Sequence, residues 1–510
     1  MTRGALLLVV ALLASGCLGA TVDLTPLSAT IETFDGAYTF PPPVAYDASG
    51  APLDAHALLS PDAMPIGIEQ MVPGIGGEPN LGVTSSGAIF VTTLDQVRRT
   101  QDQGRTWETV WDLVPPGNVT DDLYSTSDPM LWVDPDTDRV FVNQMHPGLQ
   151  CTYMAWSDDD GATWFDRPLA CSAIPGIDHQ KVMTAKPRLP VPTAGYPNVV
   201  YVCNNKRLDV FGLGGMGTSC FMSRDGGLTY PIETQAYVND QLCGNVNGHP
   251  AAFPDGTVAM VMGNLGRKCD RPFTVVLSQD DGLTWQARQC DPELGQLEID
   301  ADMTVTPDGT AYVLLRDEDQ IAHLVRSRDM FATCEHWRVS PPDNTLNVFA
   351  GITSGDDGRI AMLYLGTSTP QEVGATPSNA TPGSVWHAYV TTSHDAESDT
   401  PTFVTQQVTP DEDPVQVGCI WLGGGGGGPF TCRNLLDFID IVHDADGRWY
   451  AVITDGCNPR NGCTGSPEQS DFQSRDREVA LIAQERGASL FADRGILPPL
   501  GLTPPMPLER

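Results

Sequence analysis

One eight-residue pattern recurs along the chain and constrains its fold more than any other feature. Ser or Thr, Asp, Gly and Thr stand at alternate positions and an aromatic residue follows, as in TQDQGRTW from Thr100. The Asp carboxylate can accept backbone N–H bonds across a tight turn, and Gly supplies the positive φ that such turns need. The pattern therefore predicts a repeated β-hairpin. Close copies span 100–107, 157–164, 223–230 and 278–285, and degenerate copies begin at Ser327 and Ser393.

A second kind of turn accompanies this pattern. Gly- or Asp-containing turns separate two apolar runs, and the runs are too short and too rich in β-branched residues to be helices. Two hairpins in each unit predict a four-stranded sheet, repeated at roughly 60 residues per unit. The turns lie at 85–87, 134–136, 193–195, 254–256, 307–309, 356–358 and 444–447.

At the eight-residue pattern the chain resembles the Asp-box, or BNR, repeat of sialidases, sortilin-like receptors and xyloglucanases. The resemblance covers about residues 64 to 492. It implies an all-β fold, a β-propeller of four-stranded blades in which the Asp-box aspartates are folding devices rather than catalytic acids. We expect seven blades, because seven units are counted, with six as the alternative because sialidases have six. A strand near Ala29 to Phe34 is expected to complete the last blade.

The first residues predict export. Residues 1–16 carry one cation and then a short apolar run, which is typical of a signal peptide. Small residues precede Cys17, and this resembles the lipobox of lipoproteins, in which that thiol is lipidated; ordinary cleavage near Gly19-Ala20 is the alternative. We expect residues 1–17 to be the signal peptide, 18–63 a tether, 64–492 the propeller and 493–510 a tail. The protein would then be extracytoplasmic, either held at a membrane through Cys17 alone or secreted.

The net charge and the cysteine content limit which binding partners and which cellular compartment are possible. The formal net charge of −35 excludes nucleic acid as a partner. Without Cys17, 12 of the 13 cysteines remain, an even number that can pair fully in an oxidising compartment. Hairpin geometry and short spacing predict the pairs Cys151–Cys171, Cys203–Cys220, Cys419–Cys432 and Cys457–Cys463. Three pairings stay open for the remaining cysteines, which are Cys243, Cys269, Cys290 and Cys334.

The best candidate site follows from the propeller itself. Residues just before the innermost strands should converge at one end of the central axis, opposite the Asp boxes. Carboxylates there are candidate catalytic groups, and the ring could bind calcium, a sugar or a polyol. The candidate catalytic residues are Asp128, Asp178, Asp300, Asp302, Asp437 and Asp440. The candidate ligand-binding residues are Glu78, Asn80, His179, Gln180, Asn247, His249, Arg433 and Asn434, and blade six offers little beyond Asn347.

The positions of the arginines indicate whether the chain could bind a substrate as sialidases do. Sialidases hold the substrate carboxylate with three arginines, the first in the first inner strand, but residues 76–91 contain no Arg. Near inner strands the chain offers Arg188 and Arg433. We therefore expect a surface propeller that binds a glycan or a protein ligand at an acidic funnel. The alternatives are a sialidase-like glycoside hydrolase using a carboxylate pair there, and a structural surface or adhesion component.

Overall fold

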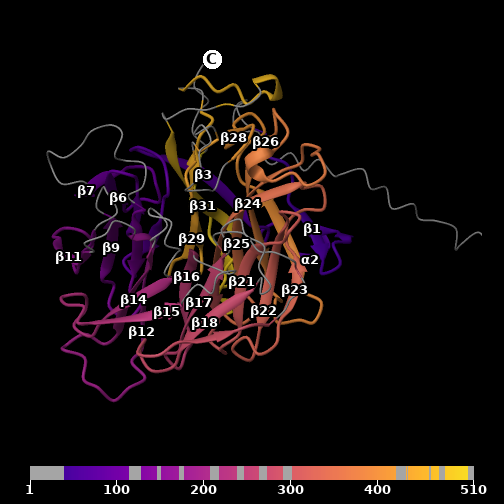
Figure 1. The fold of residues 1–510 in the computed structure, drawn as a ribbon. Coiled ribbons are helices and arrows are strands. Elements are labelled where there is room, and N and C mark those ends of the chain that lie inside the picture. Colours follow the sequence, from indigo (N-terminus) through magenta and orange to yellow (C-terminus); the bar gives the residue numbers. More distant parts are fainter. Residues whose placement is uncertain are drawn as a thin grey trace, which may run out of the picture.

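The structure of the protein is a computed structural model, and the part that it describes is almost entirely β structure (Figure 1). It contains one short α-helix, α2 (Ala55–Leu58), and the 3-10 helices η3 (Pro377–Asn379), η5 (Pro467–Gln469) and η6 (Ala492–Arg494). Within these residues no helix has the length and apolar character needed to cross a membrane. The described residues are 39–113, 128–145, 151–171, 177–206, 217–237, 246–263, 273–290, 294, 301–420, 432–433, 435–458, 461–469, 472 and 477–503.

The strands of the described residues form seven antiparallel sheets, each built around four strands. We number the blades in chain order. Blade one contains β4 (Leu81–Val83), β5 (Ile89–Thr92), β6 (Gln96–Thr100) and β7 (Glu108–Asp112); blade two β8 (Met130–Val133), β9 (Val140–Met145), β10 (Cys151–Ser157) and β11 (Phe165–Cys171). Blade three contains β12 (Ile177–Ala185), β13 (Val199–Lys206), β14 (Thr218–Ser223) and β15 (Ile232–Tyr237); blade four β16 (Val246–Ala252), β17 (Val258–Gly263), β18 (Thr274–Ser278) and β19 (Gln286–Arg288). Blade five contains β20 (Asp302–Val305), β21 (Ala311–Arg316), β22 (Ala322–Ser327) and β23 (Glu335–Arg338); blade six β24 (Leu346–Ser354), β25 (Ile360–Thr367), β26 (Val385–Ser393) and β27 (Thr402–Gln407). Blade seven contains β29 (Asp440–His443), β30 (Trp449–Asp455), β31 (Glu478–Ala488) and β3 (Ile66–Val72).

The seven sheets form a closed ring. The first strand of each blade contacts the first strand of the next, and β29 of blade seven contacts β4 of blade one. Sheets that are arranged one after another around a central axis form a propeller. The predicted all-β propeller of four-stranded antiparallel blades is confirmed, and the sheets of the described residues number seven.

Blade seven is completed by a strand from near the start of the described chain. β3 pairs antiparallel with β31, so that Ile68 lies opposite Ala483, and Figure 1 shows indigo β3 beside yellow β31. The expectation of a closing N-terminal strand holds, but the strand is β3. The segment Ala29 to Phe34, where we expected it, lies outside the described residues.

Three short segments add strands to this ring. β1 (Val44–Asp47) pairs with β27 at the outer edge of blade six, and β2 (Pro52–Leu53) pairs with β1. β28 (Gln416–Val417) pairs with β26, and β32 (Ile496–Leu497) pairs with β31. Parts of the segments expected as tether and tail are therefore folded against blades six and seven, because their apolar side chains find sheet edges to cover.

The hydrophobic core lies between successive blades rather than in one central mass. One cluster joins Val261 and Val275 of blade four to Met303 and Val313 of blade five. Another joins blade seven to blade one through residues such as Val452 and Val91. Side chains of a strand point alternately to the two faces of its sheet, so each inner blade strand contributes to two such clusters.

The eight-residue pattern forms a hairpin turn, as predicted, and the turn lies between the third and fourth strands of a blade. In the second copy Asp159 accepts hydrogen bonds from the N–H and hydroxyl of Thr163, at 2.8 and 2.7 Å, and from the hydroxyl of Ser157 at 2.9 Å. These bonds, that of the Thr163 hydroxyl first, lower the pKa of Asp159. Equivalent bonds recur around Asp102, Asp225, Asp280 and the degenerate Asp329. Because the carboxylates are committed to the turn, they act as folding devices.

Four disulfides are present in the described residues, which is typical of an oxidising, extracytoplasmic compartment. Three are the predicted pairs Cys203–Cys220, Cys419–Cys432 and Cys457–Cys463. The fourth, Cys290–Cys334, joins blade four to blade five. Cys151 and Cys171 face each other in the register of β10 and β11, although their side chains are not described. Cys17, Cys243 and Cys269 lie outside the described residues.

Candidate functional site

The inner strands begin with an unusual backbone. Glu78, Asp128, His179 and Phe349 have positive φ angles of 51°, 36°, 51° and 62°. Blades three, four and six also have a register shift near the start of the first strand, for instance between Asp178 and Lys181. Left-handed backbone in non-glycine residues costs about 1–3 kcal/mol each and concentrates at functional sites. Such shifts also re-aim side chains at the end of a strand.

Four carboxyl groups and one guanidinium come together where these strands begin, and we call them the acidic cluster. The groups are Glu78, Asp128, Asp178, Asp437 and Arg433. Glu78 is fully buried, and the three aspartates are 3–8% exposed. They come from the approaches to blades one, two, three and seven, so the ring has gathered residues separated by hundreds of positions.

Burial and mutual repulsion change the acidity of this cluster. Burial first, and then the charge of Asp437, raise the pKa of Glu78 to about 7, against the opposing effects of Asp128, Arg433 and Arg477. The pKa of Asp128 is raised well above its usual range by burial, by Glu78 and by Asp178. Among the described residues, neither oxygen of Glu78 has a hydrogen-bond donor other than the carboxyl of Asp128. Near neutral pH Glu78 can therefore be present in either its protonated or its ionised form.

Positive groups balance part of this charge. Arg433 donates two hydrogen bonds to Asp437, at 2.6 and 2.7 Å, in a bidentate ion pair. Arg477 lies close enough to lower the pKa of Glu78, and it donates to the carbonyl of Gly76. Two arginines, of which Arg433 was predicted, thus accompany the four carboxyl groups. Arg188 contributes nothing here, because it binds Asp255 and Thr257 in the turn after β16.

An aromatic layer lies next to the acidic cluster. The Phe438 ring has Lys181 Nζ 3.8 Å from its centre and the His179 ring edge-on at 5.2 Å. Phe438 and Phe349 line a space of about 10 Å³, room for about one water molecule, together with Lys181, His249 and Asp437. Our sequence analysis missed Lys181, Phe438 and Arg477. Lys181 and Phe438 adjoin predicted residues in the sequence. Arg477 precedes β31, and because β31 is not an innermost strand, the search for residues before innermost strands did not include it.

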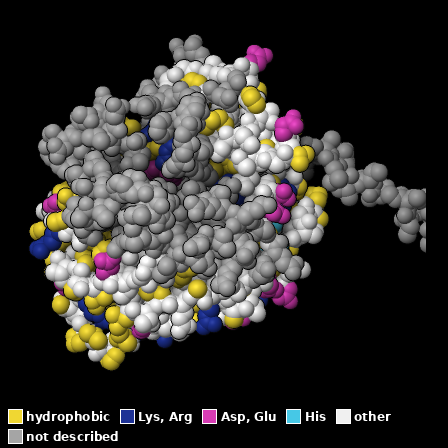
Figure 2. Space-filling model, in the orientation of Figure 1, with side chains coloured by type: hydrophobic (Ala, Val, Ile, Leu, Met, Phe, Trp, Pro, Cys, Tyr) yellow, Lys and Arg dark blue, Asp and Glu magenta, His cyan; other side chains and the backbone are white. Residues whose placement is uncertain are grey.

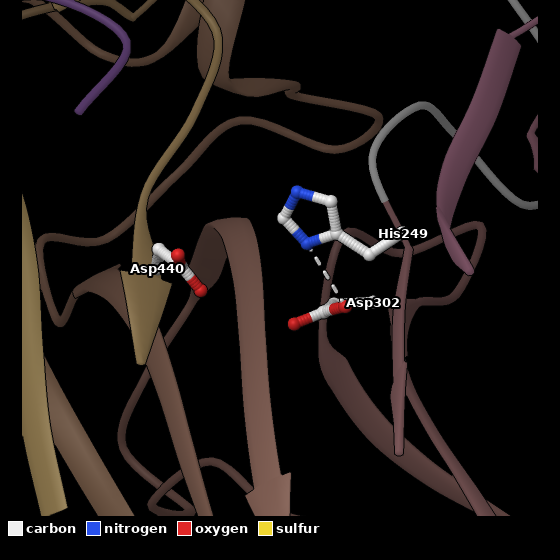
Figure 3. Close-up of side chains that lie close together, drawn as sticks. All are labelled: His249, Asp302 and Asp440. Atoms are coloured by element: carbon white, nitrogen blue, oxygen red, sulfur yellow. Dashed lines mark hydrogen bonds and ion pairs between the residues drawn. The ribbon is translucent and has the colours of Figure 1, made fainter. Parts of the chain in front are cut away.

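Three further residues form a second group, which we call the inner triad. His249, Asp302 and Asp440 come from blades four, five and seven, and one ligand atom of each lies within 4.8 Å of the others. His249 Nδ1 is 3.0 Å from Asp302 Oδ1, and Figure 3 shows Asp440 across from them. Burial raises the pKa of Asp440 to about 6; His249 opposes this shift and Asp302 adds to it.

The same polar groups link neighbouring blades. Asp302 accepts the N–H of Ile352 in blade six at 2.8 Å, and Asp440 accepts the N–H of Leu81 in blade one at 3.2 Å. Asn80 accepts the N–H of Leu131 in blade two at 2.6 Å, and Asp128 accepts that of His179 in blade three at 3.2 Å. These side chains therefore hold the ring together as well as lining its axis.

A central cavity of about 430 Å³ begins at the inner triad and is lined by the first strands of all seven blades. Its lining is mainly apolar, with residues such as Trp132 and Val182, and its polar groups include Thr184 and His443. The volume falls within the range of small-molecule sites. In the view of Figure 2, the described surface carries both acidic and basic side chains.

The structure brings most of the predicted residues together, in two groups. Glu78, Asp128, Asp178, Asp437 and Arg433 form the acidic cluster, and Asn80 joins the inner triad through a 2.6 Å bond to Asp440. Gln180 donates to the carbonyl of Asp128, and Asn247 donates to that of His179 at 3.0 Å, so both brace the backbone. Asn347 is buried and accepts the N–H of Ala322. Asp300 and Asn434 lie outside the described residues.

Comparisons with known proteins found no matching family model and no matching curated protein. Among solved structures, a Dyadobacter fermentans protein of unknown function is 14% identical with a TM-score of 0.41, covering 82% of this chain and 98% of that one. An α-L-arabinofuranosidase of Fusarium graminearum is 13% identical (TM-score 0.42; 67% and 97% covered). An intramolecular trans-sialidase of Ruminococcus gnavus is 13% identical (TM-score 0.36; 83% and 96% covered). The chain is thus similar to proteins of sialidase and arabinofuranosidase type, at values that carry no inference about its own activity.

Proposed function

We propose that this chain is an extracytoplasmic propeller, anchored through a lipidated Cys17, that binds a carbohydrate at the acidic cluster. The observation that carries the proposal is the convergence of four buried carboxyl groups and Arg433 from separate blades. Isolated buried charges are costly, so a group of buried carboxyls at the end of a propeller axis, in which the pKa values of Glu78 and Asp128 are raised, is a site candidate with a physical rationale.

The chemistry of the cluster suits sugar hydroxyls. A hydroxyl both donates and accepts hydrogen bonds, so it pairs with a carboxylate and also with a protonated carboxyl. Glu78, with a pKa of about 7, supplies either form near neutral pH, and the Arg433 guanidinium adds donors. A protein ligand would instead need a broad contact surface, which the cluster alone does not form.

Binding is tested with a glycan array and titration calorimetry on the purified protein. We expect binding to at least one glycan, and a loss of at least about tenfold in affinity for Asp437→Asn, because this change removes the ion pair with Arg433. The exposed Asp166→Asn on β11 is the matched control and should bind as wild type. Absence of glycan binding, or equal affinity of Asp437→Asn and the control, would contradict the proposal.

Glycoside hydrolysis at the same cluster is the second candidate, and one observation favours it. Glu78 can hold a proton near neutral pH, while Asp437 faces a guanidinium, so the two groups are unequal as an acid and a carboxylate must be. Release of reducing sugar from the same glycans is the measurement. Hydrolysis predicts turnover that falls by about 10²–10⁴ in Glu78→Gln, whereas binding alone predicts no turnover in either protein.

A further inference from the structure

The inner triad has the composition of a metal site. His249, Asp302 and Asp440 each present one ligand atom within 4.8 Å of the others, from three different blades (Figure 3). His249 Nδ1 and Asp302 Oδ1 are 3.0 Å apart, so both can reach one ion at about 2.0–2.2 Å, the usual distance for Zn²⁺ with nitrogen and carboxylate oxygen. Ligand atoms 4.8 Å apart exceed twice this bond length by about 0.4–0.8 Å, so a small side-chain rotation would let Asp440 join His249 and Asp302 on one cation.

The carboxylates are already oriented by surrounding donors. Asp302 accepts the N–H groups of Met303 and Ile352, both at 2.8 Å. Asp440 accepts Asn80 Nδ2 at 2.6 Å and the N–H groups of Leu81 and Ile441. Metal-binding carboxylates are typically held by such outer donors, which fix their direction. A carboxylate oxygen has more than one acceptor position, so these bonds leave room for an ion.

The charge of the triad calls for a cation. Asp302 and Asp440 are 4% and 7% exposed, and in the described chain neither forms an ion pair with Lys or Arg. His249 supplies one positive charge at most. When two buried carboxyl groups lie close together, ionisation of both is strongly unfavourable unless positive charge nearby compensates them.

Space and protonation are also compatible with a bound ion. All three residues line the central cavity of about 430 Å³, which offers room for water or a ligand at further coordination positions. His249 Nε2 is buried and has no hydrogen-bond partner within the described residues. It would carry the imidazole proton when Nδ1 binds the metal.

We propose that the inner triad binds one divalent transition-metal ion, with His249 Nδ1 and one oxygen each of Asp302 and Asp440 as ligands. The nitrogen donor favours Zn²⁺ or Mn²⁺ over calcium, which the sequence analysis considered as one of several possible ligands of the ring. The ion would join blades four, five and seven directly and blade one through Asn80. This proposal is independent of carbohydrate binding, because it rests on different residues and a different readout.

The test uses the full exported chain, treated with a chelator and then given Zn²⁺, Mn²⁺ or Ca²⁺ separately. Elemental analysis after desalting should find about one zinc or manganese per chain, and the same ion should raise Tm by several degrees, since it binds the folded state. Asp440→Asn and His249→Gln should lose both effects. His443→Gln is the matched control, because His443 lines the same cavity outside the triad and should keep them.

Several outcomes would overturn the proposal. It fails if wild type retains none of the three ions and none changes Tm. It fails equally if both triad variants bind zinc or manganese as tightly as the His443→Gln control. Binding of Ca²⁺ alone would overturn the assigned class of metal. Should a triad variant fail to fold, competition between Zn²⁺ and a chromophoric chelator in wild type still decides whether a specific site exists.

Discussion

Glu78 shows at the scale of one residue how the fold sets the chemistry. The pKa of this carboxyl is raised from its ordinary 4.5 to about 7, first by burial and then by Asp437. The folded protein therefore keeps a proton between pH 4.5 and 7 that the unfolded chain has lost. Stability due to this group is complete below pH 4.5 and falls as the pH rises through that window, by about 3 kcal/mol in total.

We expect Glu78→Gln to raise Tm relative to wild type at pH 8 and to have little effect at pH 5. The amide has the shape of the protonated carboxyl and cannot ionise, so it removes the loss of stability at high pH. Thermal unfolding of both proteins across this range gives the difference. Buried His387 and His443, whose pKa values burial lowers to about 4, weaken both proteins alike in acid and cancel in the comparison.

The exposed Glu468→Gln in η5 is the control and should give a Tm difference that does not vary with pH. A constant difference for Glu78→Gln between pH 5 and 8 would show that the pKa of Glu78 is not raised in the folded protein, and the argument for a protonated carboxyl in the cluster would be lost.

At this scale the sequence predicted part of the site. Glu78, Asp128, Asp178 and Asp437 were chosen because polar residues stood before inner strands, and they do converge. Arg477 could not be chosen, because its approach to Glu78 depends on how β31 enters blade seven. The roles of Asn80 and Asp440 as links between blades also depend on three-dimensional neighbours, which no local pattern encodes.

The turn formed by the eight-residue pattern is the element that the sequence predicted best, because all of its bonds are local. Asp225 accepts the N–H and hydroxyl of Thr229, at 2.9 and 2.6 Å, and the hydroxyl of Ser223 at 2.7 Å. We expect Asp225→Ala to lower the free energy of unfolding by about 1–3 kcal/mol. Urea unfolding is the measurement, and the exposed Asp399→Ala should change stability by less than about 0.5 kcal/mol. Equal effects of the two changes would mean that the turn bonds add nothing to stability.

The disulfides allow a comparison between two elements of the same kind. Cys290–Cys334 closes a segment with a sequence separation of 44, and Cys457–Cys463 one of 6. Loop-closure entropy predicts losses of about 4 and about 2 kcal/mol when each pair is replaced by alanine. The larger loss should belong to the pair that joins blades four and five. Denaturant unfolding that gives the opposite order would show that loop entropy does not determine their contributions.

Over the whole molecule, the propeller class was predictable because local turns repeat, whereas the identity of the strand that closes the ring was not. β3 is not followed by the eight-residue pattern, and its apolar residues resemble those of many short segments. A strand near residues 29–34 was expected in its place, because a sequence cannot show which of several candidate strands reaches the open edge of blade seven.

Two truncated proteins test the closure. A chain beginning at residue 60 lacks β1, β2 and α2, and one beginning at residue 73 lacks β3 as well. We expect the first to unfold cooperatively at a somewhat lower Tm, and the second to lose cooperative unfolding because β31 and the blade-seven core become exposed. Differential scanning calorimetry distinguishes the two. A cooperative transition of the second protein close to that of the first would show that the ring is stable without β3.

The pairing of β3 with β31 also has a consequence for the order of folding. Ile66 lies opposite Arg486, so the two strands that close the ring are about as far apart in the sequence as the propeller is long. Because the chain is synthesised from its N-terminus, the apolar strand β3 stays unpaired until the last blade has been made. Contacts between residues so far apart in the sequence also form slowly. During synthesis and export this strand is therefore the part of the propeller most exposed to mispairing, and a holding chaperone would protect it best.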